Sequence, residues 1–537
     1  MKKPPRALPQ RRAAASMRHA VAGFLTVALG RACVLLSVLI SGLVIAGCAA
    51  SAPPLTIASD APPQWYAPLP PASANANLNA NASTPALSAT SSLPHNGSLT
   101  SLSQWWQQQH DPLLVELIDA AQAVSPSVIT ARSNIAQAQA SRATSEAALL
   151  PILDASASLG RNLSAPINRA VPPISNLSQL ALQTSWELDL FGQNRASVEA
   201  DNQRLLGTEA LWHEARVSVA AEVANLYFSL RACLKLLQVA HADAGSRAET
   251  ARLIALVTQA GFEAPATAAL ARASAAESRA RVTQQRALCD LDVKALVALT
   301  GSNEPTLRKK IAETANAPTQ GIIDVSSVPA EVLGQRPDVY SAARALASAS
   351  FEVSSARAQR YPRLSISGAI AGNRVRSRTL NQNFDTWSIG PVALSVPLFD
   401  GGASQANFEA AKARYEEAAG KYRGTVRQAV REVEEALVNL QSSADRDADT
   451  AVAQAGYRAS FTGTEARYAA GLASLVELEE SRRTFLSAQS AVINLERERR
   501  SAWIALYRAL GGGWTSAAPP VRPSVPDMPE SALPRAP

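Results

Sequence analysis

The stretch Leu180–Gln193, LALQTSWELDLFGQ, changes character at a glycine. From Leu180 to Leu188, mainly apolar side chains alternate with polar or small ones, and a period of two residues indicates a β-strand. After Gly192, a run without proline extends from 193 to about 259. At 1.5 Å per residue, a helix of about 65 residues spans on the order of 100 Å. We therefore expect a strand joined directly to a helix that is longer than a globular core requires.

The same pattern occurs a second time. Val392–Gly402 reads VALSVPLFDGG, and a second proline-free run of similar length follows it. Equivalent positions keep a nearly constant offset, because Pro126 and Pro337 lie 211 residues apart and Gly261 and Gly471 lie 210 residues apart. Self-similarity at a fixed spacing indicates a repeated structural unit. Each unit is predicted to contain a helix, two strands, a long helix, a turn and a further helix.

Four strands of about ten residues are expected, around 153–160, 180–188, 364–370 and 392–398. One apolar and one polar face suit outer-membrane strands, with lipid on one side and a lumen on the other. A half-buried soluble sheet is the alternative that the pattern leaves open. Four strands cannot close a barrel, and an open edge is not tolerated in lipid. Three copies of the chain would supply a twelve-stranded barrel, an even number within the usual range.

The long helices carry a heptad pattern, which is typical of coiled coils. In the second run the apolar positions are spaced four and three residues apart: Tyr422, Val426, Ala429, Val433, Ala436 and Leu440. The first run has Arg216 at the position of Val426, so the two seams differ. The sequence thus predicts an α+β membrane protein in which a β-barrel continues into a coiled-coil wall.

Residues 1–47 contain seven Lys or Arg residues and no acid, so their removal takes the formal net charge from +7 to about zero. The remaining chain has no electrostatic reason to bind nucleic acid. The basic stretch precedes the apolar run Ala32–Gly47, as in a secretory signal. A permanent membrane-spanning anchor is the alternative, but it needs roughly 20 apolar residues, and this run is shorter.

Ile45-Ala46-Gly47-Cys48 resembles a bacterial lipobox, in which the cysteine is acylated and becomes the first mature residue. Stable membrane attachment requires more than one hydrophobic anchor, and the two lipid groups linked to the cysteine meet this requirement. By the same resemblance, Ala49 in place of an Asp implies the outer membrane. Residues 48–100, rich in Ala, Ser, Pro and Asn, are expected to form a disordered tether, and 515–537 an extended proline-rich tail.

Five segments together resemble the TolC/NodT-type outer-membrane efflux family: Leu102–Pro112 (LSQWWQQQHDP), Trp186–Gln193 (WELDLFGQ), Arg336–Val339 (RPDV), Val396–Gly402 (VPLFDGG) and Arg467–Glu477 (RYAAGLASLVE). The resemblance covers nearly all of residues 100 to 512. It implies a homotrimer in which four strands per chain form an outer-membrane barrel and the helices form a periplasmic tunnel. The implied partners are a periplasmic adaptor and an inner-membrane pump for small molecules.

The constant offset between equivalent residues places the two repeats at 101–310 and 311–514. The resemblance implies no enzymatic activity, and no cofactor is expected other than the covalent lipid on Cys48. A wide tunnel selects little, so neither the exported substrate nor the class of pump follows from the sequence.

The helical hairpins should turn at Gly261-Phe262 and Gly471-Leu472, because glycine permits a tight reversal. In the family these tips dock the adaptor, which assigns that role here to Tyr468, Gly471, Leu472, Ser474, Gly261 and Phe262. A turn glycine with local packing residues is the simpler alternative. The first tip has Gln259 before its turn and Pro265 after it, so adaptor contacts at the two tips are expected to be unequal.

Glu477 and Glu480 lie three residues apart, on one helix face beyond the second tip. In family members the equivalent positions hold acids that line the periplasmic entrance. Six carboxylates from three chains would form an acidic ring that favours cations. The alternative is a solvated acidic face paired with Arg482 and Arg483.

Cys233 and Cys289 each lie 28 residues from Gly261, on opposite arms of the first hairpin. In a regular hairpin they would face each other, and an oxidising periplasm allows a disulfide. The register must hold to within one residue for this bond to form.

Two other classes of protein were considered. Signatures of hydrolases, phosphate-binding loops and zinc proteases are absent from the sequence, and the histidines are scattered singly. A periplasmic adaptor or a lipid-anchored coiled-coil scaffold would share the long helices but would lack the four alternating strands.

Overall fold

The structure is a computed structural model that describes residues 52–58, 61–62, 65–67, 105–108, 111–163, 174–314, 333, 336–378 and 381–514. The proposed signal (1–47), the lipidation site Cys48 and the tail (515–537) lie outside the described residues, as do all of residues 68–100. Residues from Leu55 onward form one compact unit. The description below concerns that unit.

The two halves of the chain share the order helix, strand, strand, long helix, helix. The first half contains α3 (Trp105–Gln108), α4 (Pro112–Val124), α5 (Pro126–Ala147), β1 (Ile152–Leu163), β2 (Ile174–Leu188), α6 (Gln193–Gln259), α7 (Pro265–Thr300) and α8 (Glu304–Thr314). The second half contains α9 (Pro337–Ala358), β3 (Arg363–Arg376), β4 (Asn381–Ser395), α10 (Ala403–Ala469), α11 (Leu475–Ala509) and a short 3-10 turn (Gly511–Gly513). Among the described residues, α3, α4 and α8 are additional in the first half.

The expected boundary between the repeats, at 310/311, needs correction because it falls inside helix α8. Leu307 and Ile311 of α8 are both buried, so the helix folds as one piece onto the core.

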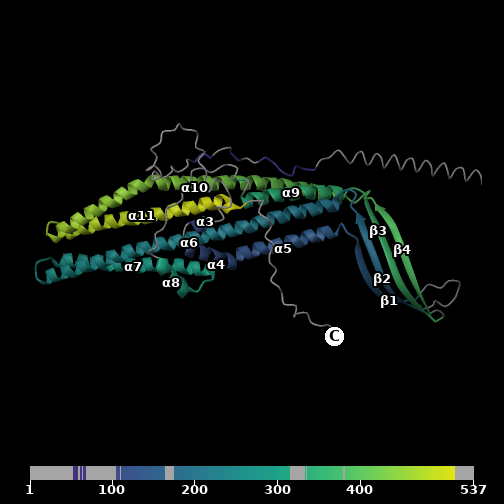
Figure 1. The fold of residues 1–537 in the computed structure, drawn as a ribbon, viewed down its shortest axis with the longest axis horizontal. Helices are drawn as coiled ribbons and strands as arrows, with labels where there is room; N and C mark the ends of the chain where they lie inside the picture. The colour runs from purple at the N-terminus through teal and green to yellow at the C-terminus, as the bar shows by residue number, and fades with distance from the viewer. Residues whose placement is uncertain are drawn as a thin grey trace, which may run out of the picture. The chain divides into compact units, whose positions relative to one another are not determined.

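The four strands form one antiparallel sheet in the order β1-β2-β3-β4 (Figure 1). Each strand has 12 to 15 residues, longer than the ten or so expected. β1 and β4 are the two edge strands, and each is hydrogen-bonded on one side only within the described chain.

A β-bulge in β4 was not anticipated from the alternation of residues. Gly368 pairs with Ile389 and Ile366 pairs with Val392, so Gly390 and Pro391 lie opposite the single residue Ser367. The extra residue restores Ile389 to the face that carries Val392, although an uninterrupted alternation would separate them. β4 then ends at Ser395, and the expected strand positions Val396 and Leu398 lie beyond it.

Both long helices begin at a glycine with positive φ, Gly192 (φ 79°) and Gly402 (φ 92°). Nearby carboxylates accept hydrogen bonds from otherwise unsatisfied N–H groups of the first turn. Asp189 accepts from Arg195 N at 2.9 Å, and Asp400 accepts from Ser404 N at 2.8 Å. The two corners therefore use the same device to join a strand to a helix of 67 residues.

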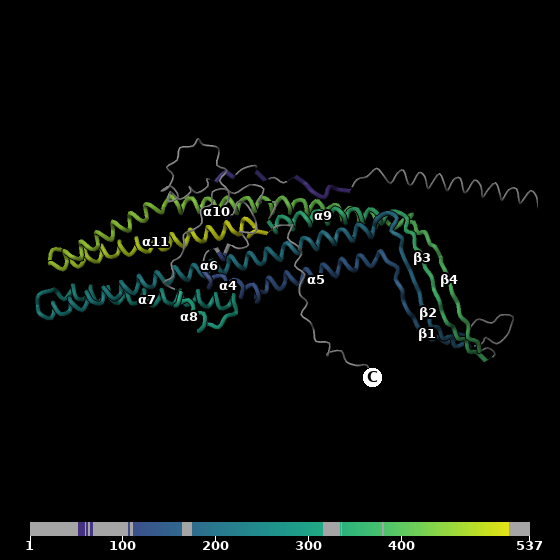
Figure 2. Tube along the Cα trace, viewed as in Figure 1, coloured from purple at the N-terminus to yellow at the C-terminus, as the bar shows by residue number. Residues whose placement is uncertain are grey.

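The helices pack as two hairpins, α6 with α7 and α10 with α11, while α5 and α9 lie beside the sheet-proximal parts of the long helices (Figure 2). Five of the six expected seam residues of α10 are buried: Val426, Ala429, Val433, Ala436 and Leu440. Most of the core lies where α4, α6, α7 and α11 meet, around Leu114, Tyr227, Leu296 and Leu506. The heptad pattern therefore marks the buried seam.

Helix α6 is also apolar enough to qualify by composition as a membrane span, as is the bent pair α4–α5 taken together. However, 61% of the most apolar window of α6 is buried against the rest of the unit. Its apolar residues are those of a core helix.

Arg336 joins three elements near the start of α9. Its guanidinium donates to Asp338 Oδ2 and Glu432 Oε2, both at 2.7 Å, and to the carbonyl of Ala509 at 2.9 Å. Only 5% of the side chain is exposed. The RPD segment singled out in the sequence is therefore a buried ionic link between α9, α10 and the end of α11.

The expectation of a disordered tether at 48–100 is corrected for residues near Trp65. Ala61 and Trp65 pack against Val339, Val426 and Ala429. The backbone N–H groups of Tyr66 and Ala67 donate to the two carboxylate oxygens of Glu434, at 2.7 and 2.6 Å. A large aromatic side chain and a carboxylate acceptor hold this short segment on α10, and composition averaged over fifty residues concealed it.

We expect Arg336→Ala to destabilise the fold by about 2–3 kcal/mol, because it leaves two partly buried carboxylates and the carbonyl of Ala509 without their hydrogen-bond donor. Arg431→Ala is the matched control, since the 60%-exposed Arg431 pairs with Glu435 on the same surface of α10 and such pairs contribute at most about 1 kcal/mol. Thermal unfolding in detergent measures both. Equal shifts of the two melting temperatures would contradict the structural role of Arg336.

Candidate functional site

One face of the sheet is apolar over most of its length. The pairing register puts the following side chains on this face, called face A: Leu153, Ala155, Ala157, Leu159, Leu180, Leu182, Trp186, Leu188, Leu364, Ile366, Ile370, Trp387, Ile389, Val392 and Leu394. Many are highly exposed, among them Leu159 (87%), Trp387 (75%) and Ile389 (88%). A contiguous apolar surface of this kind marks a membrane or protein contact.

The opposite face, face B, is mainly polar or small, with Ile152, Leu177, Val375 and Phe384 as exceptions toward its ends. It carries Asp154, Ser156, Ser158, Gln179, Gln183, Ser185, Ser365, Ser367, Thr386 and Ser388. In the half of the sheet away from the helices, Ala181 and Ala371 of face B are buried, while Leu182 and Ile370 of face A are exposed. A curved sheet exposes its convex side more, so face A is convex there.

The apolar band of face A has the height of a membrane. From Leu188 to Leu180, β2 rises about 27 Å at about 3.4 Å per residue, or about 21 Å along the normal at the usual strand tilt of about 40°. Outer-membrane barrels carry an apolar band about 25 Å tall. Face A thus has the dimensions and chemistry of a lipid-facing surface.

The hairpin tips lie at the end of the helices far from the sheet (Figure 1). Gly261 and Gly471 have φ values of 80° and 72°. The N–H of the following residue bonds back across the turn, from Phe262 to the carbonyl of Val257 at 3.0 Å and from Leu472 to that of Arg467 at 2.8 Å. Both tips are therefore Schellman motifs, in which a left-handed glycine ends the helix.

The apolar side chain after each glycine projects into solvent. Phe262 is 84% exposed and Leu472 is 70% exposed. Tyr468, by contrast, is half-buried and packs with Ile254, Leu475 and Leu478 between the two hairpins. Of the tip residues named from the sequence, Phe262 and Leu472 are thus available for contact, and Tyr468 has a packing role as well.

The two acids of the expected ring have different local partners. Glu477 forms a capping box with Ser474: its carboxylate accepts from Ser474 N at 2.7 Å, and its own N–H donates to Ser474 Oγ at 3.2 Å. The backbone hydrogen bond from Ser474 is the main cause that lowers the pKa of Glu477. Glu477 therefore stays ionised at neutral pH and to lower pH than an ordinary glutamate.

Glu480 is exposed and pairs with Arg483 at 2.6 Å. Arg482, which the sequence offered as a second partner for this acidic face, turns inward and pairs with Glu479 at 2.7 Å instead. Glu480 is therefore paired on the surface, as the solvated-face alternative expects. Glu477 instead caps the helix.

A buried ionic cluster behind the tips was missed by the sequence analysis. Arg247 of α6 bonds to Asp243 at 2.8 Å and also contacts Glu479 of α11 and Ser274 of α7. Arg482 bonds to Glu479 and, at 2.9 Å, to Ser246 of α6. The cluster links both hairpins. Its members come from three helices with no shared sequence spacing, so only the fold brings them together.

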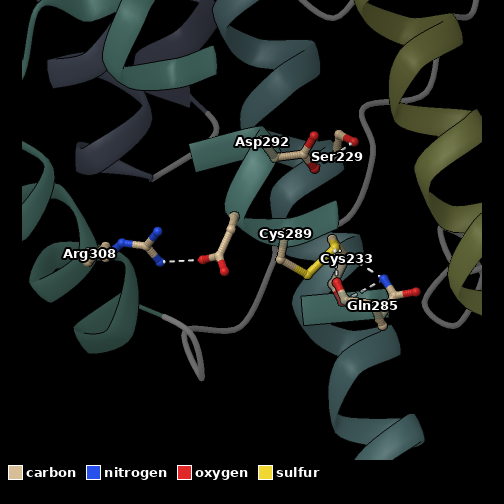
Figure 3. Close-up of a disulfide and its surroundings, with 7 residues drawn as sticks. Ser229, Cys233, Gln285, Cys289, Asp292 and Arg308 are labelled. Carbon is tan, nitrogen blue, oxygen red and sulfur yellow. Dashed lines mark hydrogen bonds and ion pairs between the residues drawn. A yellow bond between two sulfur atoms is a disulfide. The ribbon is translucent and has the colours of Figure 1, made fainter. Parts of the chain in front are cut away.

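Cys233 and Cys289 are joined by a disulfide, with Cα atoms 5.5 Å apart (Figure 3). Cys233 and Cys289 are both buried in the main core. Gln285 Nε2, one turn before Cys289, donates to the Cys233 carbonyl at 3.4 Å. The bond fixes the register of α6 against α7 at a point 28 residues from the tip glycine.

Within the described residues, no cluster of three or more His, Cys, Asp or Glu residues could hold a metal ion. Burial, with a smaller contribution from Arg216, lowers the pKa of His213 to about 4. This histidine is neutral at pH 7 and packs between Trp212 and Trp514.

Comparison with known proteins gives the family. The family model described as "Outer membrane efflux protein" matches residues 117–302 and 328–512. The chain belongs to this family. The two matched stretches contain the helical hairpins and the strand pairs of the two halves.

Named relatives of this outer membrane efflux protein include pump components. OprJ of Pseudomonas aeruginosa, an outer membrane protein, is 30% identical over 418 residues, covering 75% of this chain and 85% of OprJ. SrpC of Pseudomonas putida, a solvent efflux pump outer membrane protein, is 28% identical over 410 residues, covering 75% and 86%. The solved structure of VceC from Vibrio cholerae matches with a TM-score of 0.67 and 28% identity, covering 76% and 98%.

The chain is therefore an outer-membrane efflux channel protein of the kind found in Gram-negative bacteria. The family consists of non-enzymatic transporter components. This agrees with a site made of an apolar sheet face and hairpin tips.

The disulfide gives a direct prediction. A digest of the oxidised protein should contain one peptide pair linked through Cys233 and Cys289, and reduction should lower thermal stability by about 2–4 kcal/mol. The double variant Cys233→Ser/Cys289→Ser is the control, because its melting temperature should not respond to reductant. Identical peptide maps with and without reductant would show that the bond does not form.

Proposed function

We propose that three copies of this chain form a passive duct of a tripartite efflux pump, with a twelve-stranded barrel in the outer membrane. The observation that carries the proposal is a sheet with an exposed apolar face and two unpaired edges, β1 and β4. In lipid, those edges must pair with further strands. An antiparallel sheet from three chains supplies them and gives an even strand number.

The helices would then form the wall of a periplasmic tunnel. They leave the sheet at one end only, through the glycine corners at Gly192 and Gly402. At 1.5 Å per residue, helices of 67 residues reach on the order of 100 Å from the membrane. That length carries the tips deep into the periplasm, toward an inner-membrane transporter.

A periplasmic adaptor is proposed to dock at the tips. Exposed Phe262 and Leu472 supply one apolar contact for each hairpin, next to Gly261, Gly471, Ser474 and Tyr468. Buried apolar anchors carry most of the binding energy of protein interfaces. The different neighbours of the two glycines, including Pro265 at the start of α7, make the two docking contacts unequal.

Lipid on Cys48 is proposed to anchor the mature chain to the outer membrane. The packing of Trp65 and the hydrogen bonds to Glu434 support an extended path of the N-terminal segment along α10. No further cofactor is part of the proposal.

The exported molecules are proposed to be small and selected by the pump. The named relatives include the outer membrane components of a solvent efflux pump and of pyoverdine export. Glu477 and Glu480 are proposed to ring the periplasmic entrance, where six carboxylates would favour cations.

Single-channel recording in planar bilayers tests the duct. Purified protein should form stable trimeric channels, and Glu477→Gln with Glu480→Gln should reduce cation preference, because charged rings select ions by sign. Glu313→Gln with Glu409→Gln removes the same charge from exposed positions elsewhere. This control should keep the preference.

The recordings separate the parts of the proposal. Channels that ignore the Glu477 and Glu480 substitutions would retain the duct and remove the acidic entrance. Water-soluble protein that forms no channels would overturn the duct and favour a lipid-anchored scaffold.

Metabolic labelling with radioactive palmitate tests the anchor. Wild-type protein should incorporate the label, and Cys48→Ser should abolish incorporation, because the thiol is the attachment point. Cys33→Ser, inside the expected signal, should label like the wild type. Equal labelling of Cys48→Ser would contradict acylation at Cys48.

A further inference from the structure

Three arginines lie on the apolar face of the sheet at the end away from the helices. The register places Arg161 of β1 and Arg376 of β3 opposite the same residue of β2, Asn176, so Arg161 and Arg376 share one row of face A. Arg374 occupies the next row inward, opposite Ser178. These positions continue the columns that carry Leu180 and Ile370 closer to the helices.

The three arginines form a compact, exposed cluster. Arg161 and Arg376 are two strands apart, about 10 Å, and Arg374 and Arg376 are about 7 Å apart along β3. All three are exposed, and none forms an ion pair within the part of the chain that the structure describes. One acid of face A, Asp385, lies a further row inward, opposite Gly372. The cluster therefore keeps a positive charge.

Among the paired strand residues at this end, charge is confined to face A. On face B, the corresponding rows hold Gly160, Leu177, Val375 and Gln382, then Ser158, Gln179, Asn373 and Phe384. At the opposite, helix-proximal end of face A, the row is Leu188, Leu364 and Leu394, with no charge. The positive cluster thus marks one membrane interface and one side of the sheet, a more specific pattern than a generally basic rim.

We propose that Arg161, Arg374 and Arg376 bind the phosphorylated sugar headgroups of the glycolipid that forms the outer leaflet of the outer membrane. This inference rests on the proposed function, which places face A in lipid and the helices in the periplasm. The far end of face A then meets the outer leaflet. Among the anions at that depth, sugar phosphates are covalently fixed at the lipid surface.

The chemistry of the cluster fits phosphate. A guanidinium donates two parallel hydrogen bonds to a phosphate, a geometry that lysine cannot reproduce. Its long stem lies along the apolar surface while the charged head reaches the headgroup layer. Leu159, directly inward of Arg161 on β1, is 87% exposed and would contact the acyl chains below. The acyl chains of one lipid molecule would therefore contact the apolar side chains, and its phosphorylated headgroup would contact the arginines.

The test uses full-length, detergent-purified protein and bisphosphorylated lipid A as the probe, with lipid binding counted by native mass spectrometry. Wild-type protein should bind lipid A on the order of tenfold more tightly than its dephosphorylated form, because charge-assisted bonds to phosphate are lost. The variant Arg161→Gln/Arg374→Gln/Arg376→Gln should lose that preference. Arg272→Gln/Arg279→Gln/Arg458→Gln removes the same charge from exposed helix positions and should behave like the wild type.

Three results would overturn the proposal. The first is equal preference for phosphorylated lipid A in the wild type and the sheet variant. The second is equally tight binding of phosphatidylglycerol, which would show attraction to any anionic lipid. The third is full competition by millimolar inorganic phosphate, which would show a simple anion site.

Single-channel recording on the same preparations separates this inference from the proposed function. Intact channels without a lipid A preference would reject the arginine site alone. Loss of channels in the wild type would reject the membrane placement on which the site depends.

Discussion

The unpaired edges of a four-stranded sheet constrain everything else in this protein. Each edge strand presents a row of N–H and C=O groups, and in hydrocarbon every such group left unbonded costs several kcal/mol. Face A is too apolar and too exposed to be stable in water, with residues such as Leu159 and Ile389 almost bare. A single sheet of four strands is therefore unfavourable in lipid, because its edges are unpaired, and in water, because face A is exposed. Lipid around the sheet and further strands at its edges resolve both problems together.

The second constraint is the connection between sheet and helices. Successive side chains of a strand point to opposite faces of the sheet, whereas a helix buries the side chains along one side. The corner between them must therefore change the direction of the chain within a few residues. Gly192 and Gly402 supply left-handed backbone at the same place in both halves, and Asp189 and Asp400 satisfy the first helical N–H groups. Duplicated corners keep the two halves in equivalent positions, and within the second half Arg336 ties the start of α9 to α10 and to the end of α11.

Periodicity predicted most of this fold, because strands, long helices and turns each repeat a local rule. The bounds of α6 follow from one proline-free run between Gly192 and Gly261, two glycines whose backbone freedom permits the corner and the turn. The bulge at Gly390-Pro391 does not follow, since an inserted residue looks like ordinary sequence until its partner strand is known. The cluster of Arg247, Glu479 and Arg482 was hidden for a similar reason: its charges resemble a solvated helix surface until three helices enclose them. The short segment near Trp65 is held on α10 by one aromatic residue, which the composition of a long segment does not reveal.

The two hairpins share one sequence pattern but are held together by different interactions. A disulfide fixes α6 against α7, whereas α10 and α11 are held by side-chain packing and by charges without a covalent link among the described residues. Between the disulfide and the tips, Arg247 of α6 couples the first hairpin to Glu479 of the second, and Arg482 of the second hairpin bonds to Ser246 of the first. Arg247 and Arg482 are buried and Glu479 is nearly so, and separating the hairpins there breaks hydrogen bonds to charged groups, each worth about 1.5–3 kcal/mol. Nearer the tips, Ile254 of the first hairpin packs with Tyr468, Leu475 and Leu478 of the second. Motion of one tip relative to the other is therefore least costly beyond these contacts, in the short segments that carry Phe262 and Leu472.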